Sequence, residues 1–286
     1  MKQAQDDTRS PQTSGVAELS VSIVLYRPDE VRLVATLESL RTALCGLRKR
    51  ARPLKGHVVL VDNGGSPVLD PMLTTLRASG IVCTVLSGHG NVGYGRGHNL
   101  AIERMSGSYH LILNPDIDLD AMSLTRALDF LDVHPEVGLL TPFIADEYGH
   151  LQYLCRRHPA VSDLAIRGFL PQGARRRFDK RLARYEMRDV INDHDIVLDP
   201  PIVSGCFMLF RTDVLKQLGG FDPRYFLYFE DYDLSLRTHD IARVAYVPSV
   251  RVVHHGGGAS RKGFAHIRMF AASAFKFYNR FGWRLW

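Results

Sequence analysis

Residues 110–120 read HLILNPDIDLD, an apolar segment that runs directly into acidic residues. Residues 111–113 predict a buried strand, and Pro115 is expected to end it because proline cannot donate to a strand ladder. Asp116 and Asp118 are two residues apart, so an extended chain points both side chains the same way. Paired carboxylates suit a hard divalent cation, which takes further ligands from substrate phosphates. A solvated Asn-Pro-Asp turn explains the same letters, and this stretch alone leaves both interpretations open.

Composition indicates a globular protein with an anionic partner. The chain has 286 residues, 45% of them hydrophobic, and a net charge of +6, so a membrane surface, a phosphorylated substrate or nucleic acid would suit it. Residues 1–15 are polar, and no apolar run approaches the ~20 residues of a membrane span. The four cysteines form no C-x-x-C pair, which favours buried thiols in a reducing cytoplasm over disulfides or a zinc site. We therefore expect a cytoplasmic protein that meets membranes only at their surface.

The N-terminal third alternates between two kinds of segment. Strands are predicted at 19–26, 57–61 and 81–86, with helices at 31–47 and 68–78 between them. Such alternation argues for a parallel sheet, whose ligands bind beyond the carboxyl ends of the strands. Tyr26, Asp62 and Asp116 would lie at those ends.

A glycine-rich segment, GHGNVGYGRGHNLA, spans residues 88–101. Backbone N–H groups of such a turn at a helix N-terminus bind phosphates, although a flexible loop has the same composition. The lysine and hydroxyl of a Walker loop are missing. The dinucleotide fingerprint is also excluded, because that motif follows the first strand and this segment follows the third.

The central part of the chain offers local signals of its own. A strand is predicted at 137–143, ending at Pro142, and Gly205 is expected to permit a close backbone approach. Thr212 is the predicted N-cap of a short helix. Residues 167–188 carry eight Arg or Lys against two acids, which indicates a linker or flap that is either a solvated basic helix or a grip on an anionic acceptor or membrane.

Three acids, Glu230, Asp231 and Asp233, follow an aromatic run within FDPRYFLYFEDYDLSLR (221–237). The helix dipole accounts for one or two acids at a helix start. Apolar walls would also raise a carboxylate pKa into a range useful for proton abstraction, which makes one of them a candidate general base.

The end of the chain carries two further signals. A strand over 242–253 delivers His254 and His255, which are either structural donors or metal ligands; with carboxylates and phosphate oxygens, an imidazole would favour manganese, and magnesium would also serve. Residues 264–286 predict a helix in which aromatic and basic residues alternate. It either packs on the core or lies on an anionic membrane.

Taken in order, these segments resemble the inverting family 2 glycosyltransferases with the GT-A fold. More narrowly, they are similar to the rhamnosyltransferase branch that builds bacterial cell-surface polysaccharides and lipopolysaccharide. The resemblance covers roughly residues 20–260 and is carried by VSIVLYR, VVLVDNGG, GNVGYGRGHN, LILNPDIDL, FLYFEDYDLSLR and VVHHGGGAS.

The resemblance implies one continuous α/β domain with a Rossmann-like mixed sheet. Its parts would be a disordered tail at 1–18, a nucleotide-sugar-binding half at 19–120, an acceptor-binding and catalytic half at 121–260, and an amphipathic basic helix at 261–286. All of the site residues would then converge in a single cleft between the halves.

The resemblance also implies a role for each residue that matches a motif. Asp231 would take the proton from an acceptor hydroxyl as that oxygen attacks the anomeric carbon and inverts it. A divalent Mn²⁺ or Mg²⁺ on Asp118 and His254, with His255 fitting less well, would neutralise the diphosphate leaving group. As supporting residues, Glu230 or Asp233 would orient acceptor hydroxyls or brace Arg237. The nucleotide sugar would be bound by Tyr26, Asp62, Asn91, Gly93, Gly97, Asn99 and Asp116.

By resemblance the donor is dTDP-β-L-rhamnose, while UDP-sugars stay open because nothing in the glycine-rich segment reports a missing 2′-hydroxyl. The acceptor would be a glycan or glycolipid, such as lipopolysaccharide core or a polyprenyl-linked sugar, reached at the cytoplasmic face of the inner membrane. We expect no nucleic-acid partner. Two rivals remain: a metal-dependent sugar nucleotidyltransferase, whose lysine-rich signature the run at 48–55 matches poorly, and a non-catalytic membrane-associated scaffold.

Overall fold

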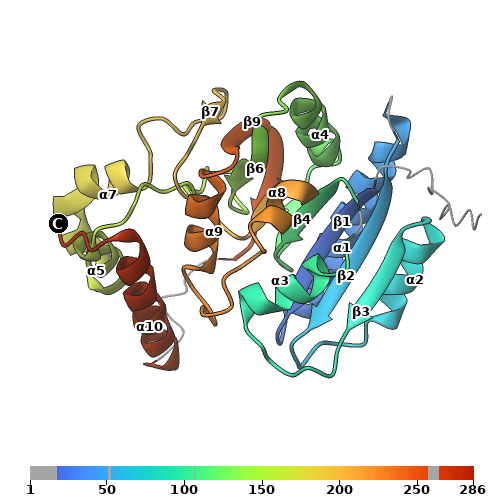
Figure 1. Cartoon of the computed structure of the whole chain (residues 1–286), viewed down its shortest axis with the longest axis horizontal. Helices are drawn as coiled ribbons and strands as arrows, with labels where there is room; N and C mark the ends of the chain where they lie inside the picture. The colour runs from blue at the N-terminus through green and yellow to red at the C-terminus, as the bar shows by residue number, and fades with distance from the viewer. Residues whose placement is uncertain (1–17, 51–52, 106, 257–263) are drawn as a thin grey trace, which may run out of the picture.

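The computed structural model describes residues 18–50, 53–105, 107–256 and 264–286 (Figure 1). Most of the tail expected at 1–18 therefore lies outside the described residues, and Glu18 already belongs to the first strand. The strands are β1 (Glu18–Leu25), β2 (Lys55–Asp62), β3 (Val82–Leu86), β4 (Tyr109–Leu113), β5 (Ile117–Leu119), β6 (Val137–Ala145), β7 (Val197–Leu198), β8 (Phe207–Arg211) and β9 (Arg243–His254).

Helices connect these strands. They are α1 (Glu30–Gly46), α2 (Asp70–Ala78), α3 (Tyr94–Ile102), α4 (Ser123–Val133), α5 (Val161–Phe169), α6 (Gln172–Arg175), α7 (Asp179–Tyr185), α8 (Thr212–Gln217), α9 (Glu230–Thr238) and α10 (Phe264–Phe281), with 3₁₀ turns at Leu47–Lys49 and Arg176–Phe178. Among the described residues, no helix is long and apolar enough to cross a membrane.

One mixed sheet runs through the molecule in the order β3-β2-β1-β4-β8-β6-β9-β5, with β7 added beside β9. The first four strands are parallel, as the alternation predicts. The polarity reverses at β8, which is antiparallel to both β4 and β6. Because the sheet is continuous across residue 120, the two expected halves share one framework.

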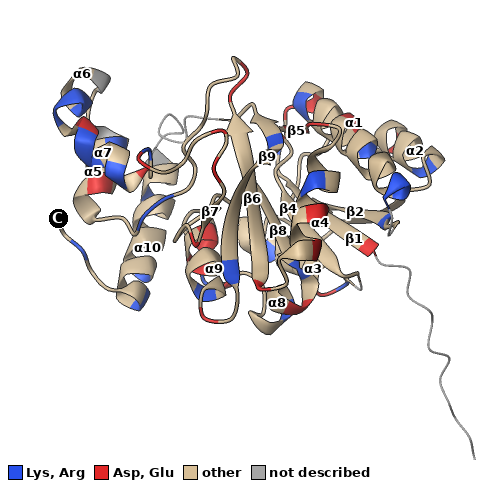
Figure 2. Ribbon diagram, turned by 90° about the horizontal axis from the view of Figure 1, so that it is seen from above, with Lys and Arg blue, Asp and Glu red and all other residues tan. Residues whose placement is uncertain are grey.

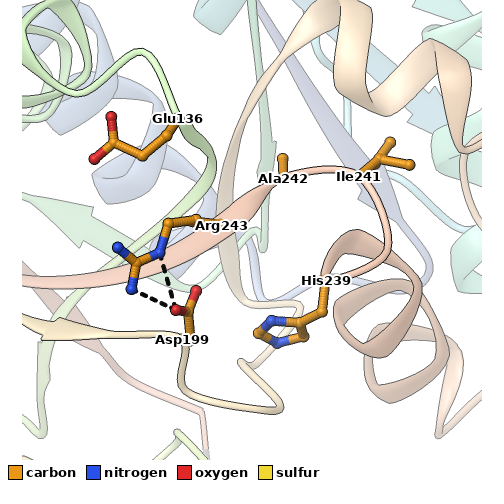
Figure 3. Close-up of a pocket in the computed structure, with 6 residues that line it drawn as sticks. All are labelled: Glu136, Asp199, His239, Ile241, Ala242 and Arg243. Carbon is orange, nitrogen blue, oxygen red and sulfur yellow. Dashed lines mark hydrogen bonds and ion pairs between the residues drawn. The ribbon is translucent and has the colours of Figure 1, made fainter.

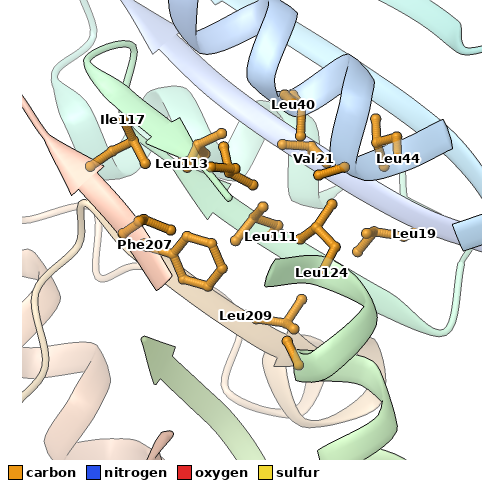
Figure 4. Close-up of a cluster of buried hydrophobic side chains, with 14 of the residues drawn as sticks. Leu19, Val21, Leu40, Leu44, Leu111, Leu113, Ile117, Leu124, Phe207 and Leu209 are labelled. Atoms are coloured by element: carbon orange, nitrogen blue, oxygen red, sulfur yellow. The ribbon is translucent and has the colours of Figure 1, made fainter. Parts of the chain in front are cut away.

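Helices cover both faces of this sheet and bury its side chains. On one face Leu40 of α1, Leu73 of α2 and Leu124 of α4 join the large cluster that Figure 4 shows around Leu111 and Phe207. The opposite face is covered by α3, α8 and α9. Both faces of the central strands are therefore buried, which explains why β4 reads as a continuous apolar run.

Two local expectations are corrected by the structure, and a third segment has the helical form that one of its two expectations gave it. The strand β6 does not end at Pro142 but continues to Ala145, because a register shift between Pro142 and Phe143 accommodates the proline. Thr212 is the first residue of α8 rather than its cap, which is Arg211. The basic segment 167–188 is mostly helical and contains the end of α5 together with α6 and α7.

The C-terminal helix α10 lies beside α9 and α5, away from strands β1, β2 and β3 (Figure 1). Phe277 and Tyr278 of α10 are buried against Ile202, Tyr225 and Phe229. Part of the terminal helix is thus a packing element, as one of the two expectations for this segment has it.

Candidate active site

The pairing of β4 with β8 places the acidic stretch next to the segment that precedes β8. Leu113 at the carboxyl end of β4 lies opposite Phe207 at the start of β8. Beyond that pair, the Asn114 N–H donates to the Cys206 carbonyl at 2.9 Å. Asp116 follows two residues after Asn114, and Asp118 lies within β5, which rejoins the sheet beside β9.

The same segment holds Asp231. The Gly205 N–H donates to Asp231 Oδ2 at 3.0 Å, and the Tyr232 N–H donates to Oδ1 at 3.0 Å. A Cβ on Gly205 would lie 3.2 Å from the Cβ of Asp231, so the close approach expected at this glycine is confirmed. Two backbone donors hold the carboxylate in one orientation and favour its charged form.

Tyr94, the first residue of α3, links the two acidic elements. Its hydroxyl lies 2.6 Å from the Gly205 carbonyl and 3.0 Å from Asn114 Oδ1. Sequence reasoning missed both Tyr94 and Asn114, although both lie inside quoted motifs, because nothing in the letters says that a tyrosine of the glycine-rich segment reaches across the sheet.

The charges that act on Cys206 and Tyr94 agree with these contacts. Burial raises the pKa of the Cys206 thiol to about 12, and the charges of Asp116 and Asp231 both add to this rise. Burial likewise raises the pKa of Tyr94, and Glu230, Asp231 and Asp116 all act in the same direction. Carboxylates from the end of β4 and from α9 therefore face one region of the molecule.

Burial dominates the titration of the two adjacent acids on α9. It raises the pKa of Asp231 above its ordinary value, against the lowering effect of the hydrogen bond from Gly205. It raises the pKa of Glu230 to about 8, with repulsion from Asp231 as the second cause. Glu230 is 5% exposed, and its Oε2 is buried with no hydrogen-bond partner among the described residues. Burial and repulsion thus favour the protonated form of Glu230.

A strained turn sets the start of α9. Tyr228 and Phe229 adopt left-handed backbone angles, with φ of 70° and 66°, which L-residues adopt at a cost. The terminal helix holds this turn: Ser273 Oγ donates to the Leu227 carbonyl at 2.8 Å, and the rings of Phe277 and Phe229 are 5.2 Å apart.

Asp233 is fully buried and forms ion pairs with two arginines, so its carboxylate does not face an open site. Arg237 Nε lies 2.6 Å from Oδ1, and Arg280 Nη1 of α10 lies 2.8 Å from Oδ2. Arg237 also donates to the carbonyls of Leu218 and Gly220. Asp233 therefore braces Arg237, which is one of the two roles expected for it, and the pair ties α9 to its surroundings.

The acids of the D-x-D stretch each face one histidine at the end of β9, where His254 is the last residue of the strand and His255 follows it. Asp118 Oδ2 lies 2.7 Å from His255 Nε2, and Asp116 Oδ1 lies 3.6 Å from His254 Nε2. The pairing differs from the expected grouping of Asp118 with His254, because β5 and β9 are antiparallel with Ile117 opposite His254. Burial lowers the pKa of His254, which keeps it neutral and able to ligate a metal.

Two carboxylate oxygens here lack partners. Asp116 Oδ1 and Asp118 Oδ1 are buried without a hydrogen bond among the described residues, which is a cost unless a cation or donor meets them. No group of three His, Cys, Asp or Glu in the described ranges is already arranged around a metal position. The donor types fit a hard divalent ion, with the remaining ligands left to substrate.

The predicted nucleotide-side residues surround the ends of β1 and β2. Tyr26 is 52% exposed directly after β1. Asp62 Oδ1 accepts from the Gly64 N–H and from Ser66 Oγ, which closes the turn after β2. Both residues stand at the carboxyl edge of the parallel strands, where the alternation of elements predicts the ligand.

The glycine-rich segment is held by polar contacts at its own backbone. Asn91 Oδ1 accepts from the Gly93 N–H at 3.1 Å, and Asn63 Nδ2 donates to the Gly93 carbonyl at 3.0 Å. Gly93 has a φ of 91°, and a Cβ there would lie 2.3 Å from the Phe226 carbonyl oxygen. Asn63 is a further residue that sequence reasoning missed.

Gly97 and Asn99 make supporting contacts within α3. A Cβ on Gly97 would lie 2.8 Å from Val24 Cγ2, so this glycine lets the helix pack on β1. Asn99 exchanges two hydrogen bonds with the backbone of Phe221. In this structure both residues hold α3 in position.

The pocket shown in Figure 3 is separate from this site. It encloses about 610 Å³ and is lined by Glu136, Asp199, His239, Ile241, Ala242 and Arg243. Arg243 begins β9 and His254 ends it, so the two places are roughly 35 Å apart along the strand.

The sequence of this chain is similar to that of known proteins. The family model described as "Glycosyl transferase family 2" matches residues 20–219. The chain belongs to glycosyl transferase family 2. The family-2 domain is 29% identical over 215 residues to an N-acetylglucosaminyl-diphospho-decaprenol L-rhamnosyltransferase of Mycobacterium tuberculosis, covering 69% of this chain and 66% of that one. It is 27% identical over 201 residues to the rhamnosyltransferase WbbL of Escherichia coli K12, covering 67% and 72%.

Solved structures confirm the fold expected from the motifs. TarS of S. aureus has a TM-score of 0.57 at 16% identity and covers 92% of this chain and 40% of TarS. The mannosyltransferase PcManGT of Pyrobaculum calidifontis, solved with GDP-Man and Mn²⁺, has a TM-score of 0.56 at 16% identity, covering 93% and 66%. The family-2 chain thus has the GT-A architecture.

Replacing Glu230 with glutamine should flatten the dependence of stability on pH. The folded pKa is about 8 against an ordinary 4.5, so between these values the folded state binds more protons than the unfolded chain. The free energy of unfolding therefore falls as pH rises through this window and levels off above it. Urea denaturation of Glu230→Gln from about pH 5 to pH 8 measures the lost slope. The exposed Glu103→Gln is the control, and equal slopes in wild type and Glu230→Gln would contradict the assignment.

Proposed function

We propose that this family-2 chain transfers L-rhamnose from dTDP-β-L-rhamnose, with inversion, to a hydroxyl of a lipid-borne glycan of the cell envelope. Rhamnosyl transfer is named in both curated relatives, and the mycobacterial one is named for a diphospho-lipid sugar. The chain spans 66% of that relative's length. The observation that carries the proposal is that the Tyr94 hydroxyl contacts both Asn114 Oδ1 and the Gly205 carbonyl, while the Gly205 N–H binds Asp231. The segment that leads to Asp116 and the segment that holds Asp231 therefore lie together.

Asp231 is the proposed general base. Its carboxylate accepts the proton of the acceptor hydroxyl while that oxygen forms a bond to the anomeric carbon, and the bond from that carbon to the diphosphate breaks on the opposite side. The Gly205 and Tyr232 N–H groups orient the carboxylate. Its raised pKa makes it a stronger base than an exposed aspartate.

Asp116 and Asp118 are the proposed carboxylate ligands of a divalent cation, with His254 and His255 beside them. Their two unpartnered oxygens fit Mn²⁺ or Mg²⁺. When bound, the cation would neutralise charge on the diphosphate leaving group. Two solved structures of the same fold are described with Mn²⁺ and a sugar or nucleotide sugar.

The terminal helix and the basic helices beside it form the proposed membrane-facing surface. Trp283, Leu285 and Trp286 are exposed by 51%, 70% and 80%. Lys and Arg side chains are concentrated over α5 to α7 and recur on α10 (Figure 2). Aromatic and basic groups together suit the headgroup layer of an anionic membrane, where a lipid-borne acceptor would be presented.

Donor binding is tested by thermal shift. We expect dTDP-rhamnose with Mn²⁺ to raise the melting temperature and UDP-glucose not to do so, because binding stabilises only the folded state. Asp118→Asn should abolish the part of the shift that depends on Mn²⁺. Asp120→Asn, an exposed acid two residues on, is the matched control. No shift with any nucleotide sugar would favour the non-catalytic scaffold.

Turnover is tested with Asp231→Asn. Removing the proton acceptor should lower the transfer rate by roughly 10²- to 10⁴-fold and leave the donor-induced thermal shift intact. Rhamnosyl transfer is measured on an N-acetylglucosaminyl-diphospho-lipid. A normal rate in this variant would exclude Asp231 as the base.

Membrane contact is tested by sedimentation with phosphatidylglycerol-containing vesicles. The double variant Leu285→Ser, Trp286→Ser should bind several-fold more weakly, and salt should release the wild type, because screening weakens contacts with anionic lipid. Val68→Ser removes a comparably exposed apolar side chain near α2 and is the control. Equal binding by the double variant would reject this surface.

A further inference from the structure

Arg156 is a buried cation without a counter-charge in direct contact. It is 3% exposed, and among the described residues no carboxylate lies within ion-pair distance of it. Its side-chain hydrogen bond is donated by Nη1 to the Cys155 carbonyl at 2.9 Å. A guanidinium has five donors, and burying its charge without a partner is costly.

Other arginines in this part of the chain differ from Arg156 because they form ion pairs. Arg157 binds Asp189 at 2.7 Å, Arg167 binds Glu186 at 3.2 Å, and Arg181 binds Asp163. Each of these arginines contacts a carboxylate, although Glu186 is shared with Arg188. Arg156 is buried and takes no part in these ion pairs, so its charge is left to a group outside this network.

Backbone pairing places Arg156 beside the base-bearing helix. Arg156 and Ile202 exchange two hydrogen bonds, of 2.8 and 3.1 Å, three residues before the Gly205 N–H that binds Asp231. Its guanidinium lies 5.6 Å from the ring centre of Tyr185, whose hydroxyl is 2.8 Å from that of Tyr232. Tyr232 directly follows Asp231. The charge of Arg156 also lowers the pKa of Asp231, as a nearby cation does.

We propose that Arg156 binds a phosphate group of the acceptor and so selects an acceptor sugar carried on a phosphate or diphosphate. This inference rests on the proposed function, in which an acceptor hydroxyl reaches Asp231. A phosphate on that acceptor sugar would come within a few ångströms of the base and of the Arg156 guanidinium. The planar guanidinium matches phosphate oxygens with paired donors, and a ligand phosphate would supply the missing counter-charge.

Direct binding gives a test that does not depend on turnover. The full chain is saturated with dTDP, so that the nucleotide site is filled, and titrated with a short prenyl diphosphate by calorimetry. We expect Arg156→Gln to weaken this binding about tenfold or more while dTDP affinity is unchanged, as loss of a charged hydrogen-bonding partner does. Arg156→Lys, which keeps the charge, should lie between the two. Arg157→Gln, whose arginine is already paired, is the matched control.

Kinetics then separate acceptor binding from an effect on the base. On an N-acetylglucosaminyl diphosphate acceptor, Arg156→Gln should raise KM about tenfold with kcat within about threefold, and on the uncharged alkyl glycoside of the same sugar it should change neither. Equal losses on both acceptors, a shifted pH profile of kcat, or unchanged binding of prenyl diphosphate would overturn the proposal. If wild type transfers no rhamnose while Arg156→Gln still loses diphosphate affinity, the proposed function fails and the Arg156 site stands.

Discussion

The antiparallel pairing of β4 with β8 is the constraint on which the site depends. Three of the parallel strands have their carboxyl ends at one edge of the sheet. A parallel sheet alone would not place Asp231 near that edge. The reversal at β8 places residues 202–206 next to Asn114, and the Gly205 N–H then fixes Asp231 through a 3.0 Å hydrogen bond. Asp116 and the proposed base Asp231 lie near each other because β8 is antiparallel to β4.

A second layer of support comes from outside the segment matched by the family model. The left-handed residues Tyr228 and Phe229 set the direction in which α9 starts, and such angles persist only where surrounding contacts hold them. Those contacts come from α10, through Ser273, Phe277 and Arg280. The terminal helix therefore supports the helix that carries the base, and the exposed residues that follow it are the ones proposed to face lipid.

The charged residues of the site differ in whether they contact a group of opposite charge. Asp233 has two arginines and is fully buried, which makes it a structural ion pair. Asp231 has backbone donors but no arginine at contact distance among the described residues, and Arg156 has no carboxylate. A buried acid and a buried cation that each lack a direct partner are costly for the empty protein, although their mutual attraction offsets part of this cost. The proposed substrate hydroxyl and substrate phosphate would supply the missing partners.

The sequence by itself determined the fold class, the family and most element positions, because these depend on local periodicity and on short motifs. Strands that lead into Tyr26, Asp62 and Asp116 could be read from apolar runs and their polar ends, and the expected GT-A architecture is confirmed. Only the tertiary structure decided which side chains meet. The partners of Asp118, Asp233 and Arg156 come from segments more than a hundred residues away or from more than one element, and strand register and helix packing carry no signature in the letters. Periodicity shows which face of a segment is buried, whereas the contact that a buried charge makes is set by the packing of the whole chain.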